Sequence, residues 1–260
     1  MTRPRWLPGV VLGSTVLLLV VAAVWAWTLI QEERATSAPD ASLADQCDRV
    51  PADAERVTLE ADDGFTLGAA TVGPAGAKTG LVIRQGAGQT LCDWLPLAGR
   101  IAEEKSVRVL LFDRRGQGSS PGEGDLTAEP GDLATAVAWL DSHGASSVGV
   151  MASSMGNSIM FAALPDLDPA PCVVISVSPV LVSSDSHGEV DGTELVDLPD
   201  NVWVATETRN TLVAAAAADI AAAADTDHVL RVDTKAHSIG LVNRFPQVAD
   251  LVVEAAGSCR

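Results

Sequence analysis

Short apolar runs alternate with helical periods along most of the chain, and this alternation constrains the fold more than any other feature of the sequence. The runs are bounded by Gly, Pro or Asp and are rich in β-branched residues, as buried strands are. Between them, apolar residues recur at spacings of three and four, which is typical of helices. Such alternation predicts a parallel sheet with helices on both faces. The predicted strands are 57–60, 65–72, 80–84, 108–113, 147–151, 172–177, 202–205 and 228–232.

The strand at 147–151 runs directly into a turn of the form small-x-Ser-x-Gly and then into a helix. Ser154 is the serine of this turn, flanked by Ala152 and Gly156. A serine hydroxyl is a weak nucleophile, so a fold that uses one presents it on a tight turn beside a base and backbone N–H donors. Small residues on either side let the strand and the helix approach closely. The pattern predicts Ser154 as a nucleophile, although a plain Ser/Gly loop has the same letters.

A glycine-rich loop follows the strand at 80–84, with the sequence Gln85-Gly-Ala-Gly-Gln-Thr90. A loop at this position can aim the N–H of Ala87 at an oxyanion, and the amide after the serine, that of Met155, supplies a second donor. The loop lacks the third glycine of a dinucleotide fingerprint and the Gly-Lys-Ser/Thr of a P-loop. An oxyanion hole is therefore favoured over a nucleotide site, and no cofactor or metal motif is found.

One histidine arrives directly after the last predicted strand. His237 lies in Asp233-Thr-Lys-Ala-His-Ser-Ile-Gly240, downstream of the serine, and we expect it to be the general base for Ser154. His143 and His228 sit at element ends and are interpreted as structural. His187, in a polar loop, is left as a candidate for the rim of the site.

These motifs resemble the α/β-hydrolase family over roughly residues 57–257. The resemblance rests on the stretches 81–88, 93–98 and 109–120 and on the turn at 152–156. It implies an α/β-hydrolase-like three-layer sandwich with a mostly parallel sheet of about eight strands, Ser154 as nucleophile, His237 as base, and Asp113 as a structural residue. It also implies no cap domain, because only about twenty residues join the strands that end near 180 and begin near 202. Gln85 stands where the family usually has a histidine, and we expect its amide to replace that hydrogen bonding.

The acid of the triad is the open position. The family generally places an aspartate after the strand at 202–205, where this chain reads Thr206-Glu-Thr-Arg-Asn-Thr211. Glu207 is the nearest carboxylate and is taken first as the residue that orients His237. Asp185 and Asn210 remain alternatives, and an exposed loop glutamate is the structural interpretation of Glu207.

The N-terminal segment 6–30 carries no charged residue and exceeds the roughly 20 residues that a helix needs to cross a bilayer. Arg3 and Arg5 precede it and Glu32 and Glu33 follow, which predicts a cytoplasmic N-terminus at 1–5 and export of everything after the segment. A cleavable signal peptide is the competing interpretation. The predicted organisation is a transmembrane anchor at 6–30, a linker at 31–44 and an α/β-hydrolase domain at 45–260, on the extracytoplasmic side of the cell membrane.

The net charge bears on the partners of the chain, and the cysteines bear on its disulfides. A formal net charge of −17 makes nucleic acid an unsuitable partner, because phosphate binding needs a basic surface. Four cysteines in an oxidising compartment predict two disulfides. Of the three pairings, strand directions favour Cys47 with Cys92, and Cys172 with Cys259.

The leading hypothesis is a membrane-anchored serine hydrolase that cleaves a small-molecule, lipid or cell-envelope ester through an acyl-enzyme. A catalytically silent binding module is the alternative of a different class, supported by the ambiguous acid and by Gln85. An acyltransferase, a peptidase or a thioesterase would use the same residues.

Overall fold

The computed structural model describes residues 37–196 and 198–259, and the predicted anchor at 6–30 lies outside them. Eight strands form one sheet in the order β1-β2-β4-β3-β5-β6-β9-β10. β1 and β2 are antiparallel to their neighbours, and all pairs from β4 to β10 are parallel, which confirms the mostly parallel sheet. The strands are β1 (Glu55–Glu60), β2 (Thr66–Val72), β3 (Thr79–Arg84), β4 (Arg108–Phe112), β5 (Ser147–Ser153), β6 (Val174–Val177), β9 (Val202–Glu207) and β10 (Val229–Val232).

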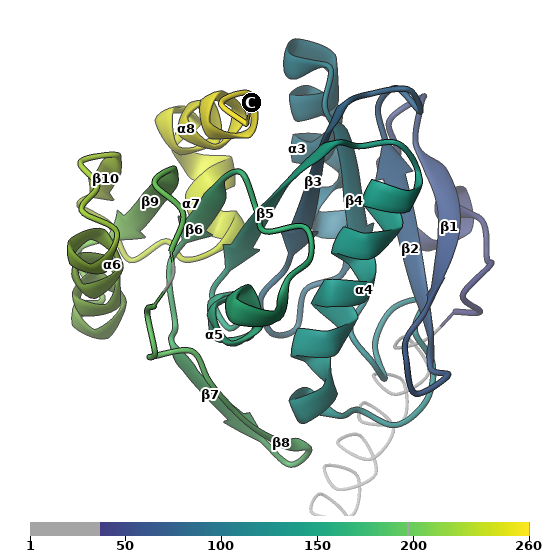
Figure 1. Ribbon diagram of the computed structural model, residues 1–260, viewed down its shortest axis with the longest axis horizontal. Coiled ribbons are helices and arrows are strands. Elements are labelled where there is room, and N and C mark those ends of the chain that lie inside the picture. Colours follow the sequence, from purple (N-terminus) through teal and green to yellow (C-terminus); the bar gives the residue numbers. More distant parts are fainter. Residues whose placement is uncertain (1–36, 197, 260) are drawn as a thin grey trace, which may run out of the picture. The chain divides into compact units, whose positions relative to one another are not determined.

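Helices cover both faces of this sheet (Figure 1). One apolar cluster joins a face of the sheet to α3, α7 and α8, and a second joins the opposite face to α4, α5 and α6. The helices are α2 (Leu43–Gln46), α3 (Leu91–Lys105), α4 (Glu129–Ser142), α5 (Gly156–Ala163), α6 (Thr211–Ala223), α7 (Ile239–Arg244) and α8 (Pro246–Ala256), with short 3-10 helices η1 (Leu126–Ala128) and η2 (Leu164–Asp166). Within the described residues, no helix combines the length and the apolar character needed to cross a bilayer.

A two-stranded hairpin follows β6 and was not predicted from the sequence. It consists of β7 (Val182–Asp185) and β8 (Gly188–Asp191), and it occupies part of the connection between β6 and β9. Val190 packs with Met155 and Ile159 at the start of α5, so the hairpin lies beside the turn that carries Ser154. In the described residues of this connection, 178–196 and 198–201, the hairpin is present and no helix is found.

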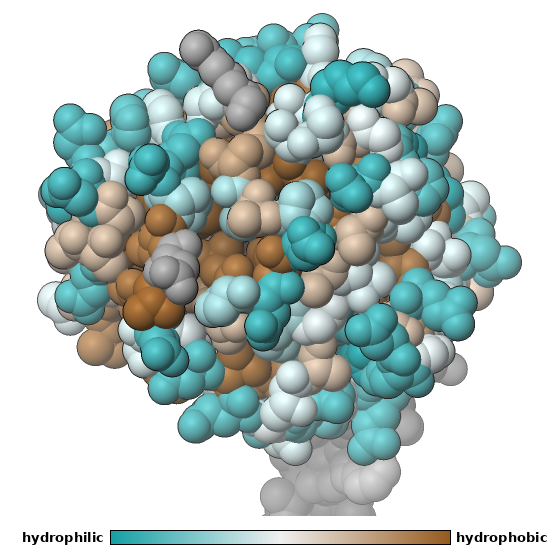
Figure 2. All heavy atoms as spheres, viewed as in Figure 1, coloured by the Kyte–Doolittle hydropathy of each residue, from teal (hydrophilic) through white to brown (hydrophobic). Residues whose placement is uncertain are grey.

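Hydrophilic residues predominate at the rim of the face that carries α4 and α5, and apolar residues show between them (Figure 2). The large apolar side chains that are exposed in the described part of the chain are Val182, Val196 and Leu212. They are isolated in the sequence, and such single residues are ordinary on a protein surface.

Both predicted disulfides are present. Cys47 pairs with Cys92, and Cys172 pairs with Cys259, each with a Cα–Cα distance of 5.2 Å. The first bridge joins the residue after α2 to the first turn of α3. Residues 37–44 of the predicted linker pack against the domain, since Leu43 lies in its core and the Ser37 N–H donates to the Gly118 carbonyl at 2.7 Å.

Candidate active site

Ser154 occupies a left-handed turn between β5 and α5. Its φ is 53°, a conformation that non-glycine residues rarely adopt and that clusters at functional sites. The turn is tight enough that a Cβ built on Gly156 would come within 2.5 Å of the Arg84 carbonyl oxygen. A glycine is therefore required at 156, and it lets α5 start directly against the end of β3. Ser154 remains half-buried, so its hydroxyl is accessible from the strand ends.

His237 reaches Ser154 from the loop after β10. Its Nε2 lies 2.7 Å from the Ser154 Oγ, and its Nδ1 lies 2.5 Å from Oε1 of Glu207. A carboxylate only accepts hydrogen bonds, so Nδ1 carries the proton and Nε2 is free to accept the serine proton. The imidazole side chain is 36% exposed, whereas the Glu207 side chain is fully buried. The three side chains form a Ser–His–Glu hydrogen-bonded chain.

Glu207 is the last residue of β9, two positions beyond the predicted end of that strand. The structure thus places it inside the fold, which corrects the interpretation as an exposed loop glutamate. Asp185 instead faces Arg114, at 3.4 Å from its Nη2, and Asn210 is the N-cap of α6. Of the three candidates for orienting His237, Glu207 is the one that the structure brings to the imidazole.

Both predicted oxyanion donors are close to Ser154. Gly86 packs against Ser154, since a Cβ built on Gly86 would come within 2.8 Å of the Ser154 Cβ, and Ala87 is the next residue. Met155 follows Ser154 at the N-cap of α5. Among the hydrogen bonds of residues 37–196 and 198–259, none uses the N–H of Ala87 or Met155 as donor. Both amides are therefore available to a ligand beside Ser154.

Gln85 and Asp113 fix the base of the glycine-rich loop 85–90, which we call the oxyanion loop after its predicted role. The Gln85 side chain is buried and donates to the Phe112 carbonyl at 2.7 Å, tying the end of β3 to β4. Asp113 accepts from the Leu91 N–H at 2.7 Å and from the Ser119 N–H at 2.7 Å. Asp113 thus joins the start of α3 to the turn after β4, which is a structural arrangement.

A set of serines lies behind the Ser–His–Glu chain, and none of them was predicted from the sequence. Ser178 is buried, has a φ of 48°, and donates from Oγ to the second carboxylate oxygen of Glu207 at 2.7 Å. The same Oγ accepts from the Ser238 N–H at 2.9 Å, and the Ser238 Oγ lies 2.7 Å from the Ser153 Oγ. The signal in the sequence was weak. Ser178 directly follows the buried strand β6, Ser153 precedes Ser154, and Ser238 follows His237.

The remaining histidines lie away from Ser154. His143 stacks on Trp139 with a centroid distance of 3.7 Å, and His228 stacks on Trp203 at 3.9 Å. His187 is exposed at the tip of the β7–β8 hairpin. It lines a pocket of about 230 Å³ with Arg114 and Asp185, and its hydrogen bonds in the described residues go to Leu126 and Asp185 and not to the triad.

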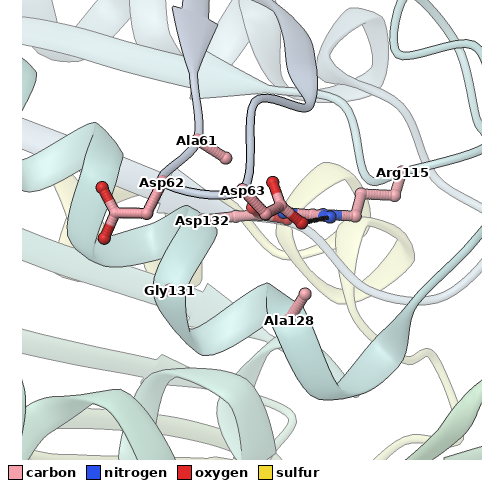
Figure 3. A pocket seen from close by; sticks show the side chains of 7 residues that line it. All are labelled: Ala61, Asp62, Asp63, Arg115, Ala128, Gly131 and Asp132. Atoms are coloured by element: carbon pink, nitrogen blue, oxygen red, sulfur yellow. Dashed lines mark hydrogen bonds and ion pairs between the residues drawn. The ribbon is translucent and has the colours of Figure 1, made fainter.

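Another pocket, of about 150 Å³, lies between the turn that joins β1 to β2 and the start of α4 (Figure 3). The Arg115 guanidinium crosses it, paired with Asp63 at 2.5 Å and with Asp132 at 2.7 Å. Burial raises the pKa of Asp132, whereas the hydrogen bond from Arg115 lowers the pKa of Asp63. In the described part of the chain, no group of three or more His, Cys, Asp or Glu residues is placed to bind a metal ion.

No known protein family and no curated protein matches the sequence. Solved structures match the fold. A Pyrococcus furiosus esterase aligns with a TM-score of 0.66 at 16% identity, over 85% of this chain and 97% of the esterase. A Pyrobaculum calidifontis esterase aligns at 0.64 and 14% identity, over 83% and 88%. A Xanthomonas campestris α/β serine hydrolase without a lid aligns at 0.61 and 20% identity, over 79% and 94%. The chain has the α/β-hydrolase fold.

Proposed function

We propose that the chain is a serine hydrolase that cleaves carboxylic esters through an acyl-enzyme. One observation carries the proposal: Ser154 Oγ, His237 Nε2, His237 Nδ1 and Glu207 Oε1 form a continuous chain with separations of 2.7 and 2.5 Å. This is the arrangement by which an imidazole activates a hydroxyl and is itself oriented by a carboxylate. The similarity to solved esterases supports the choice of an ester over other acyl compounds.

The reaction has two halves. His237 Nε2 takes the Ser154 proton as Oγ attacks the ester carbonyl, and the Ala87 and Met155 N–H groups donate to the resulting oxyanion. Collapse of this intermediate breaks the bond to the alcohol, which leaves with the proton from His237. Water then attacks the acyl-enzyme with His237 again as base, and the carboxylic acid is released. Glu207 stabilises the imidazolium that forms in each half.

A chromogenic short-chain ester tests the proposal. We expect the full-length chain in detergent to hydrolyse it, and Ser154→Ala and His237→Ala to lose roughly 10⁴- to 10⁶-fold in kcat, as removal of a triad member does elsewhere. Ser146→Ala, at an exposed serine before β5, is the matched control and should keep wild-type kcat. Equal rates in all four proteins would reject catalysis by this pair, and the absence of hydrolysis by folded wild-type protein would favour the binding module.

The acyl acceptor is a separate question. An acyltransferase would use the same triad with an alcohol in place of water. Adding increasing concentrations of a primary alcohol and measuring the ratio of new ester to free acid decides it. We expect free acid to remain the main product, and a dominant new ester at millimolar alcohol would favour transfer.

We also propose that the domain acts on the extracytoplasmic side of the membrane, anchored by residues 6–30. The charge pattern around that segment and the two disulfides support this location. The layers outside the cytoplasmic membrane are permeabilised while that membrane is kept intact. Externally added protease should then degrade the domain, while a cytoplasmic marker survives. Recovery of the protein in the alkaline-wash supernatant would contradict a membrane anchor.

A further inference from the structure

Gln89 contacts both the oxyanion loop and the loop that carries His237, although it belongs to neither the triad nor the oxyanion donors. It is the last residue of a β-turn that begins at Gly86, since its N–H donates to the Gly86 carbonyl at 3.3 Å. Gly88, within the turn, has a φ of 67°, which suits glycine. Gln89 directly precedes Thr90, the N-cap of α3. The residue therefore stands between the oxyanion loop and a helix that is fixed in the core.

The side chain of Gln89 returns to the same turn. Its Oε1 accepts from the Gly86 N–H at 3.3 Å and from the Trp94 Nε1–H at 3.0 Å. Trp94 is fully buried, and its indole can only donate, so the amide oxygen of Gln89 must face it. This settles the orientation of the amide group. The Nε2 group donates to the Ser238 Oγ at 2.9 Å, and the same Oγ lies 3.1 Å from Oε1, to which it can donate.

These contacts fix the direction of the Ala87 N–H, the predicted oxyanion donor. The carbonyl of Gly86 and the N–H of Ala87 belong to one planar peptide group and point in opposite directions. Gln89 binds the Gly86 carbonyl with its backbone and the Gly86 N–H with its side chain. The direction of the Ala87 N–H is thereby set by Gln89. That N–H has no other partner in the described residues to hold it.

The side-chain amide of Gln89 also holds the loop that carries His237. β10 lies at one edge of the sheet, with β6 and β9 between it and β5 (Figure 1). At roughly 4.8 Å per strand, the loop after β10 must cross about 14 Å to bring His237 to Ser154. Ser238, the residue after His237, has a φ of 55° and is 1% exposed. Its Oγ is bound by Gln89 and by Ser153, so the far end of this crossing is pinned beside the nucleophile.

We propose that Gln89 is a positioning residue that couples the oxyanion donor Ala87 to the base His237. The inference rests on the proposed ester hydrolysis and adds a residue that no motif identified. Through one side chain, a displacement of the turn at Gly86 is transmitted to Ser238 and hence to His237. A purely structural role, as a brace for the first turn of α3, predicts a loss of stability without a change in kcat per active site.

Gln89→Met tests the inference, because methionine preserves the length of the side chain and removes its hydrogen bonds. Active sites are titrated with a fluorophosphonate, and kcat and KM are measured on the short-chain ester. We expect kcat per titrated site to fall about 10- to 100-fold, as a displacement of about 1 Å does, with KM within twofold of wild type. Gln247→Met, at an exposed glutamine of α8, is the matched control and should keep wild-type kcat.

Two further variants keep the test decisive. Gln89→Glu retains an acceptor for the Trp94 indole, the Gly86 N–H and the Ser238 hydroxyl, so it should fold and keep more of the wild-type kcat than Gln89→Met does. In a double-mutant cycle, Gln89→Met and Ser238→Ala should be non-additive in kcat because they break one shared bond. Additive losses, or a folded Gln89→Met within twofold of wild-type kcat, would overturn the coupling. If the folded wild type neither hydrolyses the ester nor reacts with the fluorophosphonate, the proposed function fails, and the inference fails with it.

Discussion

The carboxylate of Glu207 lies 2.5 Å from His237 Nδ1 while its other oxygen accepts from the Ser178 hydroxyl at 2.7 Å. Both acceptor oxygens are thus engaged on a side chain that is fully buried. A carboxylate held from two sides cannot turn away from the imidazole. This arrangement on β9 compensates for the missing aspartate after that strand.

Replacing Glu207 should therefore abolish most activity. Glu207→Gln keeps the size of the side chain and removes its charge, so it favours the wrong imidazole tautomer and leaves the imidazolium without a counter-ion. We expect kcat for ester hydrolysis to fall on the order of 10³- to 10⁴-fold with KM little changed. Asp185→Asn and Asn210→Ala serve as controls and should keep kcat within a few fold. A larger loss in Asp185→Asn than in Glu207→Gln would assign the acid elsewhere.

The sequence predicted most of this fold because its signals are local. β-branched runs and helical periods identify elements from neighbouring residues, and Ser154 and His237 lie directly after predicted strands. Glu207 remained ambiguous because the strand continues through Thr206 and Glu207, two polar residues that read as loop.

Contacts between distant residues could not be predicted in this way. Gln89 and Ser238 are 149 positions apart, and a hydrogen bond between two common polar side chains leaves no periodicity in the sequence. The β7–β8 hairpin was missed for a related reason. Its two strands consist mostly of polar residues, and only Ser183 and Val190 in them are buried. They therefore lack the apolar run that indicates a strand.

Gly86 offers a test of the packing around the nucleophile. A Cβ on Gly86 would lie 2.8 Å from the Ser154 Cβ and 3.2 Å from the Ser153 carbonyl oxygen. In Gly86→Ala, either the oxyanion loop or the serine turn has to move, and we expect kcat to fall about 10²-fold. Gly131→Ala on α4 is the control, because a Cβ there meets nothing within 4 Å. Wild-type kcat in Gly86→Ala would show that the loop tolerates the displacement.

Glu129, at the start of α4, forms ion pairs with two buried arginines. Its carboxylate binds Arg84, which is fully buried beneath the oxyanion loop, and Arg114 at 2.7 Å. Glu129→Gln leaves both guanidinium groups without this counter-charge. Breaking a buried pair from one side typically costs about 3–5 kcal/mol, so chemical denaturation should show a free energy of unfolding lower by about that amount. A loss below about 1 kcal/mol would mean that Asp185 or solvent replaces Glu129.

Arg209 and Asp233 form a two-bond ion pair, at 2.7 and 2.9 Å, between the loops that follow Glu207 and precede His237. The hydrogen bonds that Arg209 donates lower the pKa of Asp233 below the ordinary value of 3.8. A carboxyl whose pKa is lower in the folded state adds stability above its unfolded pKa and loses that contribution as the pH falls through the folded value. We expect Asp233→Asn to lower Tm slightly at pH 6, and the difference from wild type to shrink below about pH 4. Asp219→Asn, at an exposed aspartate of α6, should show no such pH-dependent difference. A constant difference from pH 6 to pH 3 would mean that the effect of Asp233 does not come from its charge.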